Sequence, residues 1–153
     1  MIHLAYKKEQ LALVQVATGS FDEASIEPLL GLADQFQRDA NGSNRMAYWL
    51  TIIDDQAEPP GALARKRLAS TTIPFQNLRC AVVTSSALHR AILVALRWLA
   101  PAKPGQLFAE FGRFQEATRW MEQQAREPMP FWEELLHEAQ PVAGPSKRAA
   151  SWR

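Results

Sequence analysis

The chain has 153 residues, with 17 Lys and Arg against 16 Asp and Glu, a net charge of +1 and 47% hydrophobic residues. This length suits one domain of roughly 100–200 residues, and the apolar fraction is too high for a disordered chain. The near-neutral charge argues against the strongly basic surface of nucleic-acid-binding proteins. One cysteine and three scattered histidines form no recognisable metal set and allow no internal disulfide, so we expect neither cofactor nor metal.

The first residues of the chain lack the basic-then-apolar layout of a signal peptide. The best apolar run, residues 91–96, is far shorter than the roughly 20 residues of a transmembrane helix. The sequence therefore predicts a cytoplasmic protein without an integral membrane segment.

The N-terminal part of the chain predicts a hairpin followed by a helix. Two β-prone runs, Ile2–Tyr6 and Leu11–Ala17, flank a polar gap of four residues, which is typical of antiparallel strands. From residue 26 to residue 40 the apolar positions have helical spacing. We expect Ser25 to cap this helix and Pro28 to lie in its first turn, where no backbone N–H is needed.

The middle of the chain predicts further strands separated by a helix. The run Met46–Ile53 is almost continuously apolar, which is typical of a strand buried on both faces of a parallel sheet, and Arg79–Thr84 is expected to be the next buried strand. A helix is expected over residues 62–72, ended by Pro74, and a short final strand over Gln106–Phe111. Cys80 falls inside a strand and is expected to be a small core residue.

The clearest amphipathic pattern follows Ser85 and Ser86, which we expect to cap a helix. His89 is expected on its surface. The expected core face of this helix consists of Leu88, Ala91, Ile92, Ala95, Leu96 and Leu99. Shorter helical patterns occupy residues 114–121 and 131–139, and the second is expected to pack on the domain or on a second copy of it. We therefore divide the chain into an α/β domain (1–126), a helical appendage (127–140) and a flexible tail (141–153).

The element order predicts an α/β fold with a mixed, mainly parallel four- to five-stranded sheet, an N-terminal hairpin and flanking helices. Short motifs follow in this order: Val16-Ala17-Thr18-Gly19-Ser20-Phe21, Leu50-Thr51-Ile52-Ile53-Asp54, Ala81-Val82-Val83-Thr84-Ser85-Ser86, Leu107-Phe108-Ala109-Glu110-Phe111 and Glu116-Ala117-Thr118-Arg119-Trp120-Met121. With these motifs, residues 1–126 resemble the STAS domain of anti-sigma-factor antagonists and sulfate transporters. The chain looks closer still to the bacterial STAS-like proteins grouped with lipid-binding CRAL-TRIO domains.

This resemblance implies a regulatory module that binds other proteins, or alternatively a domain that binds a lipid or another small apolar ligand. The antagonists resemble one another in a phosphorylatable serine between the third strand and the second helix. Here that place holds Asp54-Asp55-Gln56-Ala57-Glu58-Pro59-Pro60-Gly61, which contains no serine or threonine. We therefore do not carry the phosphoserine switch over to this chain.

Two groups of charged residues are candidate binding sites. Asp54 and Asp55 follow a buried strand, where α/β proteins usually place their chemistry, and could bind Mg²⁺ or act as acid and base. The alternative, which we favour, is that they form a solvated turn and complement the dipole of the next helix. Arg65 and Arg67 form a basic patch with Lys66 that suits a phosphate, an acidic partner or a lipid headgroup, although such runs are usually the solvated face of a helix.

Ser85 and Ser86, with His89 close behind, are candidate nucleophiles, but no acidic partner is identifiable and a capping role is favoured. The chain contains no phosphate-binding loop and no known hydrolase or metalloprotease motif. We therefore favour a non-enzymatic interaction module that binds a protein partner or forms a homodimer, and that binds no nucleic acid. The alternatives are an apolar-ligand or lipid-binding domain, and an enzyme that uses Asp54 and Asp55 with a metal ion.

Overall fold

The computed structural model describes residues 1–20, 23–64, 66, 75–99 and 101–140. The elements are β1 (Ile2–Lys7), β2 (Ala12–Ala17), α1 (Glu23–Ser43), β3 (Ala47–Ile53), β4 (Leu78–Val83), α3 (Ala87–Leu99), β5 (Gln106–Phe111), α4 (Phe114–Ala125) and α5 (Trp132–Ala139). The strands of the described ranges form one five-stranded sheet in the order β1-β2-β3-β4-β5. β1 pairs antiparallel with β2, and the other pairs are parallel. The predicted mixed α/β fold with an N-terminal hairpin is confirmed.

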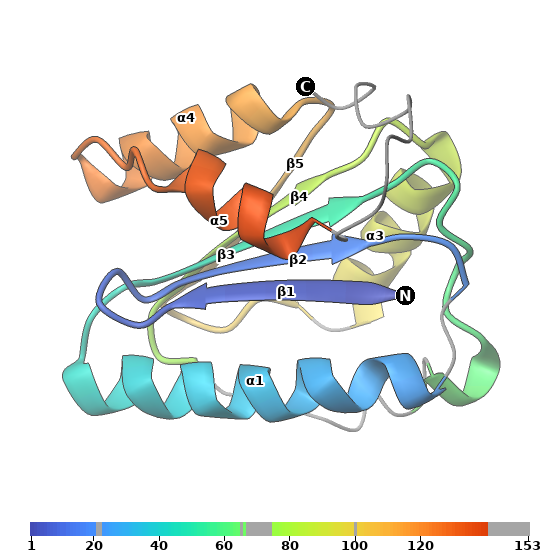
Figure 1. Ribbon diagram of the computed structural model, residues 1–153, viewed down its shortest axis with the longest axis horizontal. Coiled ribbons are helices and arrows are strands. Elements are labelled where there is room, and N and C mark those ends of the chain that lie inside the picture. Colours follow the sequence, from blue (N-terminus) through green and yellow to red (C-terminus); the bar gives the residue numbers. More distant parts are fainter. Residues whose placement is uncertain (21–22, 65, 67–74, 100, 141–153) are drawn as a thin grey trace.

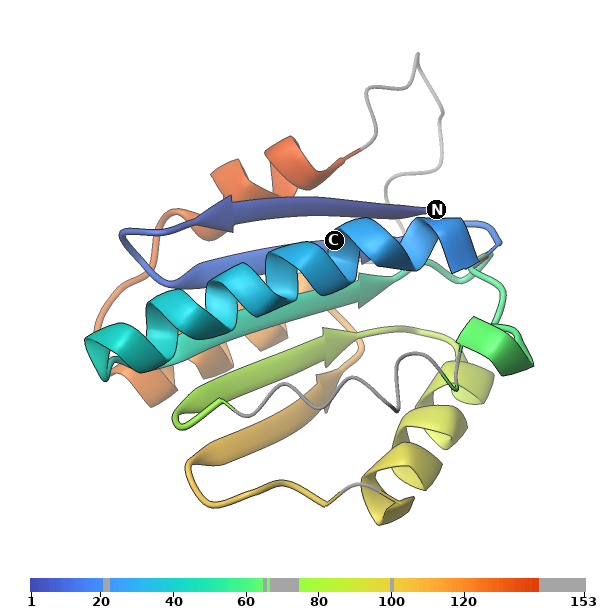
Figure 2. The same ribbon diagram turned by 90° about the horizontal axis from the view of Figure 1, so that it is seen from below.

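The molecule has three layers, with the sheet in the middle (Figure 1). The helices α4 and α5 cover one face, and α1 lies along the other. α3 belongs to the α1 side, since Leu93 of α3 packs against the same cluster as Phe36 of α1. Figure 2 shows that α1 follows the first strands, whereas α3 lies toward the carboxyl end of β4. The connections through α1 and α3 pass over the same face of the sheet, which agrees with the sequential order of the parallel strands.

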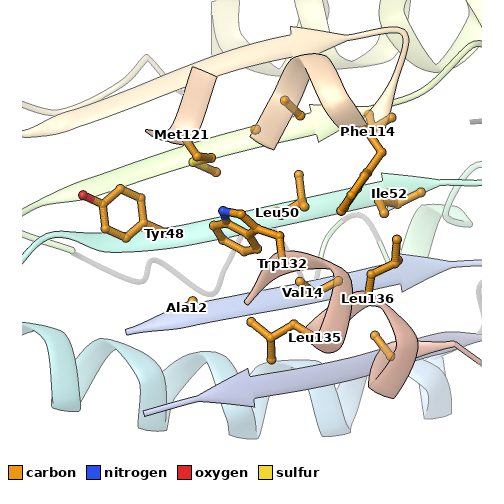
Figure 3. Close-up of a cluster of buried hydrophobic side chains, with 14 of the residues drawn as sticks. Ala12, Val14, Tyr48, Leu50, Ile52, Phe114, Met121, Trp132, Leu135 and Leu136 are labelled. Carbon is orange, nitrogen blue, oxygen red and sulfur yellow. The ribbon is translucent and has the colours of Figure 1, made fainter. Parts of the chain in front are cut away.

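The core on the α4 and α5 side is fully closed (Figure 3). The Trp132 ring lies over β2 and β3, with Tyr48 and Leu50 beside it. The other large members of this cluster include Phe114, Met121, Leu135, Leu136, Ile52 and Val14. Because α5 supplies several of these buried side chains, the segment predicted to pack on the domain or on a second copy packs on its own domain.

The core on the α1 side is built around aromatic rings. The Phe36 ring lies 5.3 Å from that of Tyr6, 6.1 Å from that of Trp49 and 5.1 Å from that of Phe75, measured between centroids. Cys80 is buried in the same cluster. Burial raises the pKa of its thiol to about 12, so Cys80 is the unreactive core residue that the sequence predicts.

Two local predictions are wrong. The helix α1 begins at Glu23, so Ser25 lies inside it and Pro28 falls beyond the first turn. β3 is completely buried on one face only, because its residues Trp49, Thr51 and Ile53 remain half-buried on the α1 side. The helix expected over 62–72 is seen at residues 62–64 and 66, and its remainder lies outside the described residues.

Candidate functional site

The structure brings two of the predicted site residues together at the carboxyl ends of neighbouring strands. β3 and β4 are parallel and in register, with Ile52 opposite Val83. The residues that follow them therefore meet at one edge of the sheet. There the hydroxyl of Ser85 donates a hydrogen bond to Oδ1 of Asp55. Both side chains are exposed, so this contact is a solvated hydrogen bond.

The neighbouring predicted residues, Asp54 and Ser86, hold the backbone of the two turns. Oδ1 of Asp54 accepts a hydrogen bond of 2.8 Å from the backbone N–H of Gln56, which forms a tight turn. Oγ of Ser86 accepts a hydrogen bond of 3.3 Å from the backbone N–H of His89. This is the geometry of a helix N-cap, so the predicted capping of α3 is confirmed for Ser86.

The side chains at this edge of the sheet form no recognisable catalytic or metal-binding group among the described residues. Asp55 contacts a neutral hydroxyl and no cation among the described residues, and Asp54 and Ser86 are engaged with backbone groups. Across the part of the chain that the structure describes, no three His, Cys, Asp or Glu side chains are grouped so that they could hold a metal ion. Arg65 and Arg67, the predicted basic patch, lie outside the described residues.

α3 is rotated about its axis relative to the prediction. His89, expected on the surface, is 93% buried, and its Nδ1 has no hydrogen-bond partner among the residues that the structure describes. Of the six residues expected in the core, Leu88, Ala91 and Ala95 are exposed and Ile92 is half-buried. The side chains of the other two, Leu96 and Leu99, lie outside the described part of the structure. The prediction is wrong because α3 is apolar around most of its circumference, so the apolar pattern alone does not decide which side meets the sheet.

The rotation leaves an apolar stripe facing solvent along the whole length of α3. We define this outward stripe as Leu88, Ala91, Val94, Ala95 and Trp98. Leu88, Ala91, Ala95 and Trp98 follow one another at spacings of three, four and three residues, which places them on one side of a helix with 3.6 residues per turn. Trp98 is 85% exposed and Leu88 is 59% exposed. Single exposed apolar residues are ordinary on protein surfaces, but a continuous stripe with an uncovered tryptophan is typical of an interaction surface.

The outward stripe has basic residues along one of its two borders. Arg90 and Arg97 are one heptad apart on α3, and the helix contains no Asp or Glu. Arg97 reaches β5, where its guanidinium lies 2.6 Å from Oε1 of Glu110. This ion pair ties α3 to the edge of the sheet. Arg90 makes no ion pair with any described residue.

A shallow hollow of about 410 Å³ lies at the start of α4, on the opposite face of the sheet. Its lining consists of Arg113, Gln115, Glu116 and Arg119. All of these are polar, and the arginines stand beside a carboxylate. None of the four lining residues is aliphatic or aromatic, and the carbon stems of these polar side chains form most of the wall. The hollow therefore offers no large apolar side chain to a lipid or another apolar ligand.

Comparison with known proteins found no match among family models, curated proteins or solved structures. Within the described ranges, no helix combines the length and the apolar character needed to cross a bilayer.

The apolar pattern of the sequence did not identify the outward stripe as a site. Its signal was present, since α3 has more apolar residues than one buried face can use.

Proposed function

We propose that this chain is a non-enzymatic protein-interaction module that binds another protein through the outward stripe of α3. The observation that carries this proposal is the exposure of Trp98 together with Leu88 and Val94 on one helix. Burying such side chains against a partner stabilises a complex by about 25 cal/mol for each Å² of apolar surface removed from water. Tryptophan is also the residue type that most often dominates binding energy at protein interfaces.

The candidate site at the carboxyl edge supports the same proposal. Asp54 and Ser86 stabilise turns, and Asp55 is paired with the hydroxyl of Ser85. The resemblance to STAS domains, which regulate other proteins by contact, agrees with a role in binding. The absence of serine and threonine from residues 54–61 favours regulation by occupancy of a surface over a phosphoserine switch at that turn.

The proposal is tested by comparing the proteins that co-purify with the full-length wild type and with single variants made in the source cells. Val94→Asp and Trp98→Asp place a charge on the outward stripe. Each should lower the amount of co-purifying partner by more than tenfold. Leu107→Asp is the matched control, because Leu107 is 42% exposed, as Val94 is 43% exposed, but it lies on the other face of the sheet.

A partner that is retained by Leu107→Asp and lost from both α3 variants supports the proposal. A partner that is retained by all variants, or lost from all of them equally, contradicts it. Unfolding midpoints of the variants, measured in urea, separate the loss of binding from the loss of folding.

The alternative function, binding of a lipid or a small apolar ligand, has weaker support in the described part of the chain, where no aliphatic or aromatic residue lines the hollow at α4. Native mass spectrometry of freshly purified protein discriminates the two proposals. A co-purifying lipid would favour the alternative, and a chain free of small ligands would favour the interaction module.

A further inference from the structure

We infer that the partner presents an amphipathic helix whose apolar side chains are bordered by Asp or Glu. This inference rests on the proposed function and names the chemistry of the partner at the same stripe. It draws on the shape of the stripe and on the charges beside it.

The shape of the outward stripe suits a large apolar side chain from a second helix. Ala91 and Ala95 lie between the bulky ends Leu88 and Trp98, and Val94 lies to one side of them, on the border toward Arg90 and Arg97. The two alanines therefore form a low place in the stripe with larger side chains around it. A leucine or a phenylalanine of a partner helix can enter between Leu88 and Trp98 in the way that knobs enter holes in packed helices. A helix that binds in this manner exposes its apolar residues at helical spacing.

The arginines beside the stripe favour a partner helix that has acidic residues next to its apolar side chains. Arg90 and Arg97 lie on the same border of the stripe, and no carboxylate of α3 offsets them. Arg97 already forms an ion pair with Glu110, whereas Arg90 is exposed and available to a carboxylate of the partner. Opposite charges at the rim of an interface increase the association rate and suppress wrong partners.

The same charges disfavour a second copy of this chain as the occupant. In an antiparallel pair of α3 helices, Arg90 of one copy meets Arg97 of the other copy, and α3 has no acidic residue to separate them. An anionic membrane is also less favoured, because two arginines, one of them already paired, provide little electrostatic attraction.

The inference is tested with the full-length protein and two labelled peptides of about five helical turns. Both peptides carry the same leucine face, and one has Glu while the other has Gln at the bordering positions. At low salt we expect the Glu peptide to bind about fivefold more tightly, as measured by fluorescence anisotropy. In about 1 M salt, where charges are screened beyond roughly 3 Å, this difference should disappear.

Two variants assign the effect to the residues. Arg90→Glu should reverse the preference, so that the Gln peptide binds more tightly than the Glu peptide. Val94→Asp should weaken both peptides by more than tenfold, and Leu107→Asp should weaken neither.

Equal binding of the two peptides, lost in Val94→Asp, would overturn the inference about acidic borders and leave the proposed function intact. Failure of both peptides to bind would overturn the inference that the partner is a helix, and the co-purification experiment would then decide the proposed function separately. Binding of wild type to phosphatidylserine vesicles in preference to both peptides would also overturn it, in favour of a membrane surface.

Discussion

The helices α3 and α5 differ in how much of their apolar surface is buried, although both are rich in apolar residues and each contains a tryptophan. Trp132 of α5 lies at the centre of a closed core (Figure 3) and is 2% exposed, whereas Trp98 of α3 is 85% exposed. α5 buries all of its large apolar side chains, Trp132, Leu135 and Leu136, against the sheet. α3 has apolar residues on two sides and buries only one of them. A helix that is apolar beyond the width of its buried face has a surface left over for another molecule.

Ion pairing does not explain this difference. Each helix contacts an edge strand through a salt bridge, Lys7–Glu134 at 2.5 Å for α5 and Arg97–Glu110 at 2.6 Å for α3. Exposed ion pairs contribute about 0–1 kcal/mol, so neither bridge decides how firmly its helix is held. The amount of apolar surface buried beneath each helix determines how firmly that helix is held against the sheet.

The largest expected effect is a contrast between the two tryptophans. Trp132→Ala should lower the free energy of unfolding by about 3–5 kcal/mol, because it removes a large side chain from a closed core. Trp98→Ala should change that free energy by no more than about 0.5 kcal/mol. Urea unfolding followed by circular dichroism measures both, and equal losses of stability would show that α3 is buried as deeply as α5.

The next effect separates the two serines that precede α3. Ser86→Ala should cost about 1 kcal/mol of unfolding free energy, because the backbone N–H of His89 loses its acceptor. Ser85→Ala removes an exposed hydrogen bond to Asp55 and should cost no more than about 0.5 kcal/mol. A larger loss for Ser85→Ala than for Ser86→Ala would contradict the assignment of Ser86 as the cap.

The smallest expected effect concerns pH on the closed side of the molecule. Burial, and then the positive N-terminal amine, lowers the pKa of His3 from its usual 6.5, so the folded chain favours the neutral imidazole. Below about pH 6.5 the unfolded chain binds the proton more readily than the folded chain, so the contribution of His3 to stability is present above this pH and is lost as the pH falls.

His3→Asn should therefore show a shallower loss of stability than wild type between neutral and mildly acidic pH. The urea midpoint measured as a function of pH checks this expectation. Parallel curves for wild type and variant would contradict the lowered pKa of His3.

The strands and the order of elements could be predicted because apolar runs and turn residues are local signals. The final strand, Gln106–Phe111, was predicted with its observed bounds, and the hairpin agrees within one residue at each inner end. The start of α1 was predicted wrongly, because Ser25 is a good cap by type but lies inside the helix. Propensity for a cap is a weaker signal than the continuation of the helix.

The candidate site was predictable where it follows strand ends and unpredictable where it depends on rotation. The meeting of Asp55 with Ser85 follows from two parallel neighbouring strands. The outward stripe depends on which side of α3 faces the sheet, and α3 has apolar residues at nearly every angle except those of Arg90 and Arg97. That choice is made by tertiary packing, which buries His89 and leaves Leu88 in solvent.

The most direct test is the amide hydrogen exchange of the full-length chain, alone and with the protein that co-purifies with it. We expect the partner to slow exchange across α3, residues 87–99, and to leave α4, residues 114–125, unchanged. Slower exchange over α4 or over the turn at residues 54–57, with α3 unchanged, would contradict the assignment of α3 as the binding surface.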